Sequence, residues 1–218
     1  MPYPTTNAAK ELPAVNQILA SVGQAPVTTL DQTNPDVAIA YDTLLQVSRE
    51  VQAEGWTFNR EYNYKTTTDD NKEFVIPNNM LQVDLSSNTT VSSRVAHTNG
   101  SKNVIRRSGK LYDKYKTEDQ YQITNNANDT IYIDVTWLFD WVDLPVPIQD
   151  YITARAATIV SSRIVGDGAQ FQMLQGNEFR AKAVALEYET NQGDYTFFGH
   201  PQGQNYYNSY QPYKALYR

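Results

Sequence analysis

The chain has 218 residues, a formal net charge of −6 and no cysteine. The absence of thiols excludes a disulfide framework, a cysteine-ligated zinc or iron–sulfur site and thiol catalysis. The acidic balance argues against a protein that coats nucleic acid, because that kind of binding depends on an excess of Lys and Arg. No apolar run reaches the roughly 20 residues that span a bilayer, and the N-terminal MPYP lacks the pattern of a signal peptide. We therefore expect a soluble protein that folds without oxidation.

Two helices are predicted at the start of the chain. Apolar residues recur at helical spacing within residues 11–22 and again within residues 35–54. Gly23 and Gly55 follow the two stretches and are expected to end them, and Asn34 is the expected N-cap of the second, with Pro35 at its first position. The residues expected to face the core are Leu12, Val15, Leu19, Val22, Val37, Ala40, Tyr41, Leu44, Ser48 and Val51.

From residue 56 to about residue 146 the pattern changes to short strands and turns. Strands are predicted at residues 56–58, 74–76, 81–85, 121–124 and 131–135, which are rich in β-branched and aromatic side chains. Turns are predicted at Asn99-Gly100 and Ser108-Gly109. These signals indicate an antiparallel β domain of about 90 residues.

The sequence returns to helices after Pro145. A third helix is predicted up to Gly166, and a fourth from residue 169 to residue 189. The residues expected to face the core are Ile148, Ile152, Ala156, Ile159 and Arg163 in the third helix, and Phe171, Leu174, Phe179, Ala183 and Leu186 in the fourth. The predicted fold class is α+β, a helical bundle of N- and C-terminal helices with an inserted antiparallel β domain. The predicted boundaries are 1–55 and 147–194 for the two halves of the helical domain, 56–146 for the β domain and 195–218 for a C-terminal arm.

The predicted arm, residues 195–218, contains six of the 16 tyrosines of the chain. It has too few regularly spaced aliphatic residues to form a core of its own, so we expect it to dock on something, most simply another subunit. The alternative is that it packs back on its own β domain. The tyrosines predicted to lie in a protein interface are Tyr206, Tyr207, Tyr210, Tyr213 and Tyr217.

Charge is unevenly distributed along the chain. The segment from residue 94 to residue 116 has a net charge of +6, and the remainder has −12. A basic segment in an acidic protein favours a complementary contact with another subunit, although contact with DNA phosphates and a lysine-protected edge strand are alternatives. The basic residues predicted to lie in a protein interface are Arg94, Arg106, Arg107 and Lys110.

No pattern in the sequence indicates an enzyme. The two histidines, His97 and His200, are far apart, and neither an HExxH pair nor a GxSxG elbow is present. Asp69 and Asp70 are adjacent, and adjacent positions on a strand point to opposite faces. The sequence predicts no catalytic, cofactor-binding or metal-binding residues.

Several strings, in register over nearly the whole chain, resemble the tail tubular protein A family, the head-to-tail adaptors of short-tailed podovirus phages. The resemblance is strongest over residues 11–59 and includes GWTFN as its most specific string. The strings that carry it are ELPAVNQILASVG (11–23), PVTTL (26–30), GWTFN (55–59), LYD (111–113), DLP (143–145) and EYE (187–189).

This resemblance implies a structural virion protein rather than an enzyme. It implies a homo-dodecameric ring that joins the portal protein to the tail nozzle, tail tubular protein B, and continues the channel through which genomic DNA leaves without sequence-specific binding. It also implies a location in the virion tail, assembly in the host cytoplasm, no cofactor and no membrane partner. The alternative from a different class is a receptor- or glycan-binding phage tail module that uses the exposed tyrosines and amides of the β region.

Overall fold

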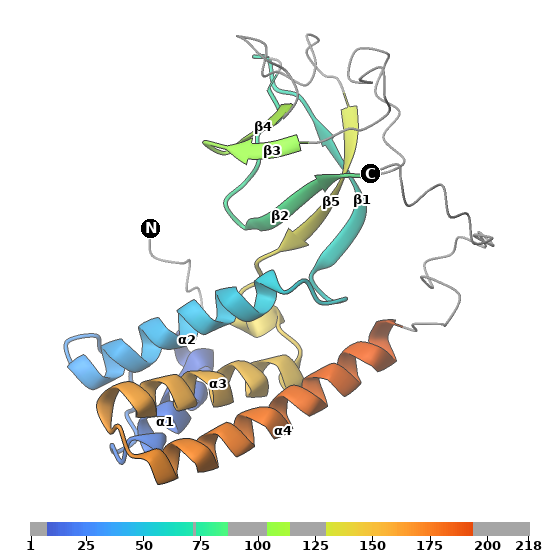
Figure 1. Ribbon diagram of the computed structural model, residues 1–218. Helices are drawn as coiled ribbons and strands as arrows, with labels where there is room; N and C mark the ends of the chain where they lie inside the picture. The colour runs from blue at the N-terminus through green and yellow to red at the C-terminus, as the bar shows by residue number, and fades with distance from the viewer. Residues whose placement is uncertain (1–7, 72, 87–103, 114–129, 194–218) are drawn as a thin grey trace. The chain divides into compact units, whose positions relative to one another are not determined.

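The computed structural model describes residues 8–71, 73–86, 104–113 and 130–193 (Figure 1). Within these ranges the chain has helices at both ends and antiparallel strands between them, so the predicted α+β class is confirmed. The described residues form two compact units. One comprises the described parts of residues 1–58 and 139–195, and the other the described residues between Asn59 and Leu138.

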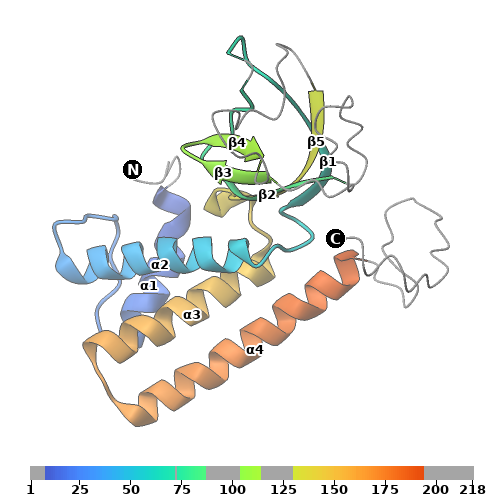
Figure 2. The same ribbon diagram turned by 45° about the horizontal axis from the view of Figure 1, so that its top comes forward.

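The first unit is helical, with α3 at its centre. It consists of α1 (Ala8–Ser21), α2 (Pro35–Ala53), α3 (Val146–Ile164) and α4 (Gly168–Gly193), with a short 3-10 turn, η1 (Trp141–Asp143), before α3. Helix α3 packs against each of the other three helices (Figures 1 and 2). The core between them is mainly aliphatic, and its fully buried members include Ile18, Leu44, Ile148 and Ile152.

The helix ends lie where the sequence predicts them. Asn34 caps α2, because its side-chain oxygen accepts a hydrogen bond from the Asp36 N–H at 3.0 Å. Gly23 takes the left-handed conformation, with φ of 76°, after α1. Its N–H donates to the carbonyl of Ala20, and the next N–H, of Gln24, donates to Leu19, which is the Schellman arrangement. Local chemistry therefore fixes these boundaries.

The predicted core faces of α1, α2 and α3 are largely confirmed. All six residues predicted in α2 are buried, and so are Ile148, Ile152 and Ala156 in α3. Arg163 is a wrong prediction, because it lies in the last turn of α3 and is exposed.

The predicted core face of α4 is wrong. Phe179 is 65% exposed and Leu186 is 48% exposed, whereas Ala185 is fully buried. Phe171 and Ala183 are also exposed, and Leu174 is half-buried. The reason is that α4 meets the helical core through small residues, and its large apolar residues are spread around the helix instead of marking one face.

The predicted strand at residues 56–58 is also wrong, because this segment is a turn that belongs to the helical core. The indole Nε1 of Trp56 donates to the carbonyl of Val51 at 2.7 Å. The ring packs edge-on against Tyr151, with centroids 6.5 Å apart. Both carboxylate oxygens of Glu189 in α4 accept the Thr57 N–H at 2.9 Å. The aromatic and β-branched composition is typical of a strand, but here these side chains bind helices.

The second unit contains two antiparallel sheets. Strand β5 (Thr130–Trp137) lies between β1 (Arg60–Thr67) and β2 (Met80–Leu85), and β3 (Val104–Arg107) pairs with β4 (Lys110–Asp113). The predicted strands at 81–85 and 131–135 are confirmed. The strand at 74–76 is reduced to a single bridge, between Val75 and Lys110. The predicted strand at 121–124 and the Asn99-Gly100 turn lie outside the described residues.

Strand β1 is absent from the sequence prediction. Its sequence, REYNYKTT, is polar almost throughout and offers no aliphatic alternation. It is held instead by its pairing with β5 and by Tyr64, whose ring packs edge-on against Trp137 at 5.3 Å. The core beneath the sheet contains Phe74, Ile76, Met80, Val104, Leu111, Ile131, Ile133 and Val135.

Gln52 provides the first test of this fold. It is fully buried in α2, its Oε1 accepts the Phe139 N–H at 2.8 Å, and its Nε2 donates to the Phe139 carbonyl at 3.2 Å. Gln52→Ala leaves the N–H and the C=O of Phe139 without this partner, and each unsatisfied buried group costs about 1–3 kcal/mol. We expect urea denaturation to show a free energy of unfolding lower by at least about 2 kcal/mol. Gln46→Ala, at an exposed position of the same helix, is the control and is expected to stay within about 0.5 kcal/mol. Equal effects of the two substitutions contradict the role assigned to Gln52.

Glu11 provides a pH-dependent test. Its side chain lies in the helical unit and is 5% exposed, and its Oε2 has no hydrogen-bond partner among the described residues. Burial raises the pKa of Glu11 above its ordinary value, a hydrogen bond with Tyr41 opposes the shift, and the charge of Asp140 adds to it. The folded state therefore binds this proton more tightly than the unfolded state does.

The sign of the pH effect follows from that difference. Stability from this group is fully present below its unfolded pKa, near 4.5, and is lost as the pH rises through the higher folded pKa. Glu11→Gln removes the dependence, so the variant gains stability relative to the natural chain between pH 4 and pH 7. Urea denaturation at the two pH values measures this difference, and Asp42→Asn, at an exposed position of α2, is the control. If the free energy of unfolding of Glu11→Gln differs from that of the natural chain by the same amount at pH 4 and pH 7, the raised pKa of Glu11 is contradicted.

Candidate interaction surfaces

The hairpin of β3 and β4 contains three of the basic residues predicted to lie in an interface. Its turn is confirmed at Ser108 and Gly109, both with positive φ (49° and 75°), which is the type I′ geometry that suits the twist of paired strands. The register pairs Arg107 with Lys110 across the hairpin. These two cationic side chains therefore lie on the same face, opposite to the buried Leu111.

Two of the three cations have partners within the β unit. The Nζ of Lys110 lies 2.5 Å from the Glu73 carboxylate, and that hydrogen bond raises the pKa of Lys110. Arg106 donates to the carbonyl of Met80 and, at 3.3 Å, to the side-chain oxygen of Asn78. Arg107, in contrast, is exposed. The charge available for a partner is thus smaller than the basic count of the segment suggests.

The other residues predicted to lie in an interface cannot be placed. Arg94 and the five tyrosines Tyr206, Tyr207, Tyr210, Tyr213 and Tyr217 lie outside the described residues.

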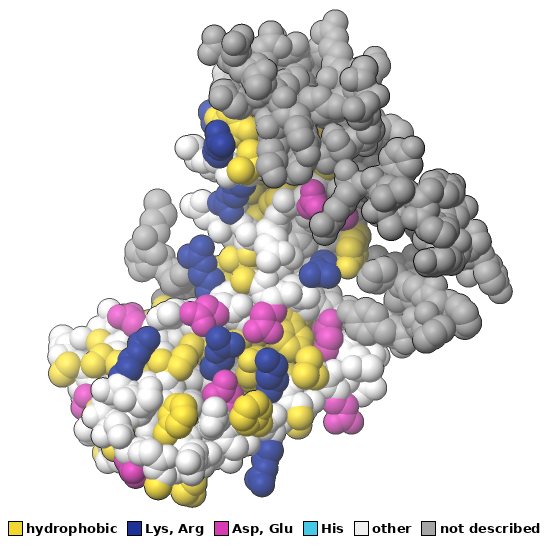
Figure 3. Space-filling view, in the orientation of Figure 1, with side chains coloured by type: hydrophobic (Ala, Val, Ile, Leu, Met, Phe, Trp, Pro, Cys, Tyr) yellow, Lys and Arg dark blue, Asp and Glu magenta, His cyan; other side chains and the backbone are white. Residues whose placement is uncertain are grey.

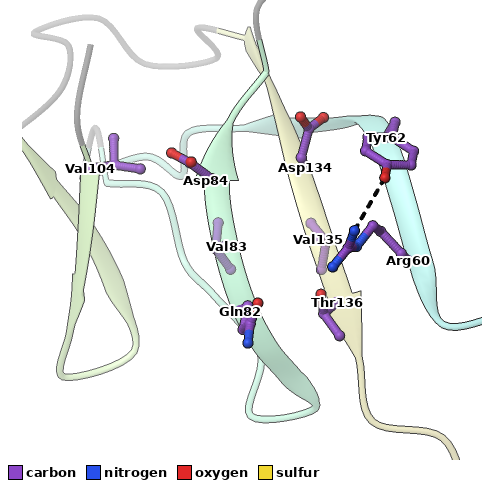
Figure 4. A pocket seen from close by; sticks show the side chains of 9 residues that line it. All are labelled: Arg60, Tyr62, Gln82, Val83, Asp84, Val104, Asp134, Val135 and Thr136. Carbon is purple, nitrogen blue, oxygen red and sulfur yellow. Dashed lines mark hydrogen bonds between the residues drawn. The ribbon is translucent and has the colours of Figure 1, made fainter. Parts of the chain in front are cut away.

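An open hollow of ≈ 460 Å³ lies over the three-stranded sheet (Figure 4). Sequence reasoning does not single it out, because its lining comes from separate strands that only their register brings together. Gln82 pairs with Thr136, and Asp84 pairs with Asp134. Within β1, the guanidinium of Arg60 donates to the hydroxyl of Tyr62 at 3.4 Å. The lining residues are Arg60, Tyr62, Gln82, Val83, Asp84, Val104, Asp134, Val135 and Thr136.

The lining contains two carboxylates, Asp84 and Asp134, together with the hydroxyls of Tyr62 and Thr136. Each carboxylate binds a backbone donor, since Asp134 accepts from the N–H of Asn63 at 2.9 Å and Asp84 from that of Leu85 at 2.8 Å.

Across the described parts of the chain, no three His, Cys, Asp or Glu side chains are grouped closely enough to hold a metal ion. None of the described helices is both long enough and apolar enough to cross a membrane.

A further surface lies on α4, where large apolar side chains reach the solvent. Figure 3 shows hydrophobic side chains spread over the exposed face of the helical unit, among separate acidic and basic ones. Met173, Phe179, Val184 and Leu186 are each about half exposed or more. Exposed apolar helix surface of this kind is typical of a contact with another protein.

An exposed arginine on a hairpin and exposed apolar residues on a helix are features typical of proteins that contact other proteins. Residues 12–195 match the family described as tail tubular protein, whereas no curated protein matches the chain. Because the match covers most of the chain, the protein belongs to the tail tubular protein family, as the resemblance predicted. It is thus a structural protein of the phage tail.

The different surroundings of Arg106 and Arg107 lead to opposite expectations. Arg106→Met leaves the Met80 carbonyl without this partner, so we expect the free energy of unfolding to fall by about 1–3 kcal/mol. Arg107→Met removes only an exposed charge and is expected to change it by less than about 0.5 kcal/mol. Urea denaturation of both variants makes the comparison. Equal losses contradict the assignment of Arg106 to the interior of the β unit.

Proposed function

We propose that this tail tubular protein is the head-to-tail adaptor of a short-tailed phage. In this role it forms a homo-dodecameric ring that joins the portal protein to the tail nozzle. The family match over residues 12–195 carries the proposal. The resemblance of residues 11–59 to adaptors of the tail tubular protein A family narrows it to this position in the tail.

The charge of the chain supports a passive role toward DNA. A net charge of −6 disfavours tight binding of phosphates, which suits a channel through which genomic DNA passes without being held. No small-molecule substrate, cofactor or membrane partner is part of this role. Assembly in the host cytoplasm, followed by residence in the virion tail, completes the proposal.

The two predicted interface segments have separate roles in it. The tyrosine-rich residues 195–218 bind the portal or a neighbouring subunit, because tyrosine combines apolar contact area with a hydrogen-bonding group. The basic segment around Arg107 contacts an acidic neighbour or the nozzle. Screening by salt weakens that contact, since an exposed charge interacts through water.

Negative-stain imaging of the protein mixed with its portal tests the proposal. We expect rings seated on one face of the portal, and co-sedimentation of the two proteins. A variant that lacks residues 200–218 is expected to lose most of the co-sedimentation, whereas Arg107→Met is expected to weaken assembly more at low salt than at high salt.

Three results would count against the proposal. A trimeric particle without affinity for portal, together with binding on a glycan array, supports the receptor-binding alternative instead. Undiminished portal binding after deletion of residues 200–218 contradicts the proposal that the C-terminal arm binds the portal. If neither salt nor Arg107→Met changes assembly, the basic residues are better explained as protection of an edge strand.

A further inference from the structure

The side of α4 that faces α3 is poor in large apolar residues. Figures 1 and 2 show α4 lying along α3, the helix that packs against it. Of the 26 described residues of α4, only Ala185 and Gly193 are buried. Most of the half-buried residues recur three or four positions apart and therefore form one row with Ala185. The row consists of Gln170, Leu174, Glu178, Ala181, Ala185 and Tyr188. Leu174 is its one large aliphatic member.

The other three helices are held together by a core of their own. Each of them contributes fully buried aliphatic side chains, such as Ile18 in α1, Leu44 in α2 and Ile152 in α3. To this core α4 adds the small side chains of Ala185 and, in part, Ala181. Hydrophobic stabilisation grows with the apolar area that is removed from water, and local stability is low where few apolar contacts are buried. Helix α4 therefore has the least apolar stabilisation of the four helices.

Polar contacts hold α4 in place instead, and the strongest of them lies near its C-terminal end. The Glu189 carboxylate accepts the Thr57 N–H with both oxygens at 2.9 Å and the Thr57 hydroxyl at 2.6 Å. Hydrogen bonds to a charged group are about twice as strong as those between neutral groups. One turn and more before Glu189, the Nζ of Lys182 lies 5.8 Å from the centre of the Tyr151 ring in α3. We call the pair of Glu189 and Thr57 the clasp.

The connection between α3 and α4 has the properties of a hinge. Gly166 has a positive φ of 68°, and a side chain added at Gly166 or Gly168 would find open space. The connection is exposed, and glycine changes its backbone conformation at little steric cost. Hinges are a few loop or helix-terminal residues of this kind. Close to it, the Gln170 side chain donates to the Ser21 carbonyl, which keeps the first turn of α4 beside the end of α1.

We propose that α4 is a strap that the clasp holds closed and that opens away from α3 about Gly166 and Gly168. Opening breaks the hydrogen bonds of the clasp and exposes a few small side chains, whereas the core of α1, α2 and α3 stays intact. It uncovers the side of α3 on which α4 lies, together with the polar row of α4. A protein that binds either of these sides selects the open form. Because all of these contacts lie within one chain, opening requires neither a ring nor the portal protein.

A single introduced thiol reports this opening, because the chain has no cysteine of its own. Ala185→Cys places the thiol on the covered side of α4. Ala40→Cys is the matched control, since Ala40 is equally buried but lies in α2. A water-soluble aromatic disulfide is expected to label Ala185→Cys at least about tenfold faster than Ala40→Cys, each rate being normalised to that of the same variant unfolded in urea. Ala181→Cys replaces Ala185→Cys if that variant does not fold.

The dependence of labelling on urea separates the opening of α4 from unfolding of the whole helical unit. The slope of the free energy against urea concentration scales with the surface that becomes exposed. Opening of α4 exposes little surface, so labelling of Ala185→Cys is expected to rise only slightly at low urea, whereas labelling of Ala40→Cys is expected to rise steeply. Equal rates with the same steep slope mean that α4 leaves α3 only when the whole unit unfolds, and this result would overturn the inference.

Substitution of Glu189 tests the clasp itself. Glu189→Ala, combined with Ala185→Cys, is expected to raise the labelling rate about tenfold or more, because the hydrogen bonds to a charged group are lost. Glu187→Ala, at an exposed position of the same helix, is the matched control and is expected to change the rate less than about twofold. Equal effects of the two substitutions on labelling would mean that the clasp does not hold α4 closed, and would likewise overturn the inference.

Discussion

The hydrogen bonds between Gln52 and Phe139 are the constraint on which the helical unit depends. The chain leaves this unit after α2 and returns to it 87 residues beyond Gln52. Gln52 satisfies the N–H and the C=O of one residue at the point of return. A buried amide can do this only in one position and orientation, because both of its polar ends would otherwise lose a partner. The pairing thereby fixes where the return segment lies against α2 and, with it, where α3 begins.

Residues 55–57, through which the chain leaves α2, also stabilise the packing of the helical unit. Gly55 takes a positive φ of 78°, which turns the chain after α2 at little steric cost. Trp56 then fills the core beside Tyr151, and Glu189 holds the backbone of Thr57. The GWTFN string, which is the most specific part of the family resemblance, is thus a set of residues that ties α2, α3 and α4 together. Its role in the described structure is architectural.

The sequence predicts the elements whose signals are local. The Asn34 cap, the Gly23 stop and the Ser108-Gly109 turn depend on the conformational preferences of one or two residues, and each is found where it is predicted. Strand β1 and the α4 core face depend on partners distant in sequence, and neither is predicted correctly. In β1 a polar strand is held by its pairing with β5 and by the packing of Tyr64 against Trp137, and in α4 the alanines of the covered side give no hydrophobic signal. Prediction fails where tertiary contacts override the local pattern.

The same distinction applies to the interaction surfaces. A count of charges identifies the basic segment, but the count cannot tell that Lys110 is paired with Glu73 and that Arg106 binds a carbonyl. The exposed apolar side chains of α4, such as Met173 and Phe179, are invisible to such a count, because they carry no charge. The two kinds of surface respond differently to solution conditions. An exposed arginine acts through a field that salt screens, whereas apolar burial is not weakened by moderate salt.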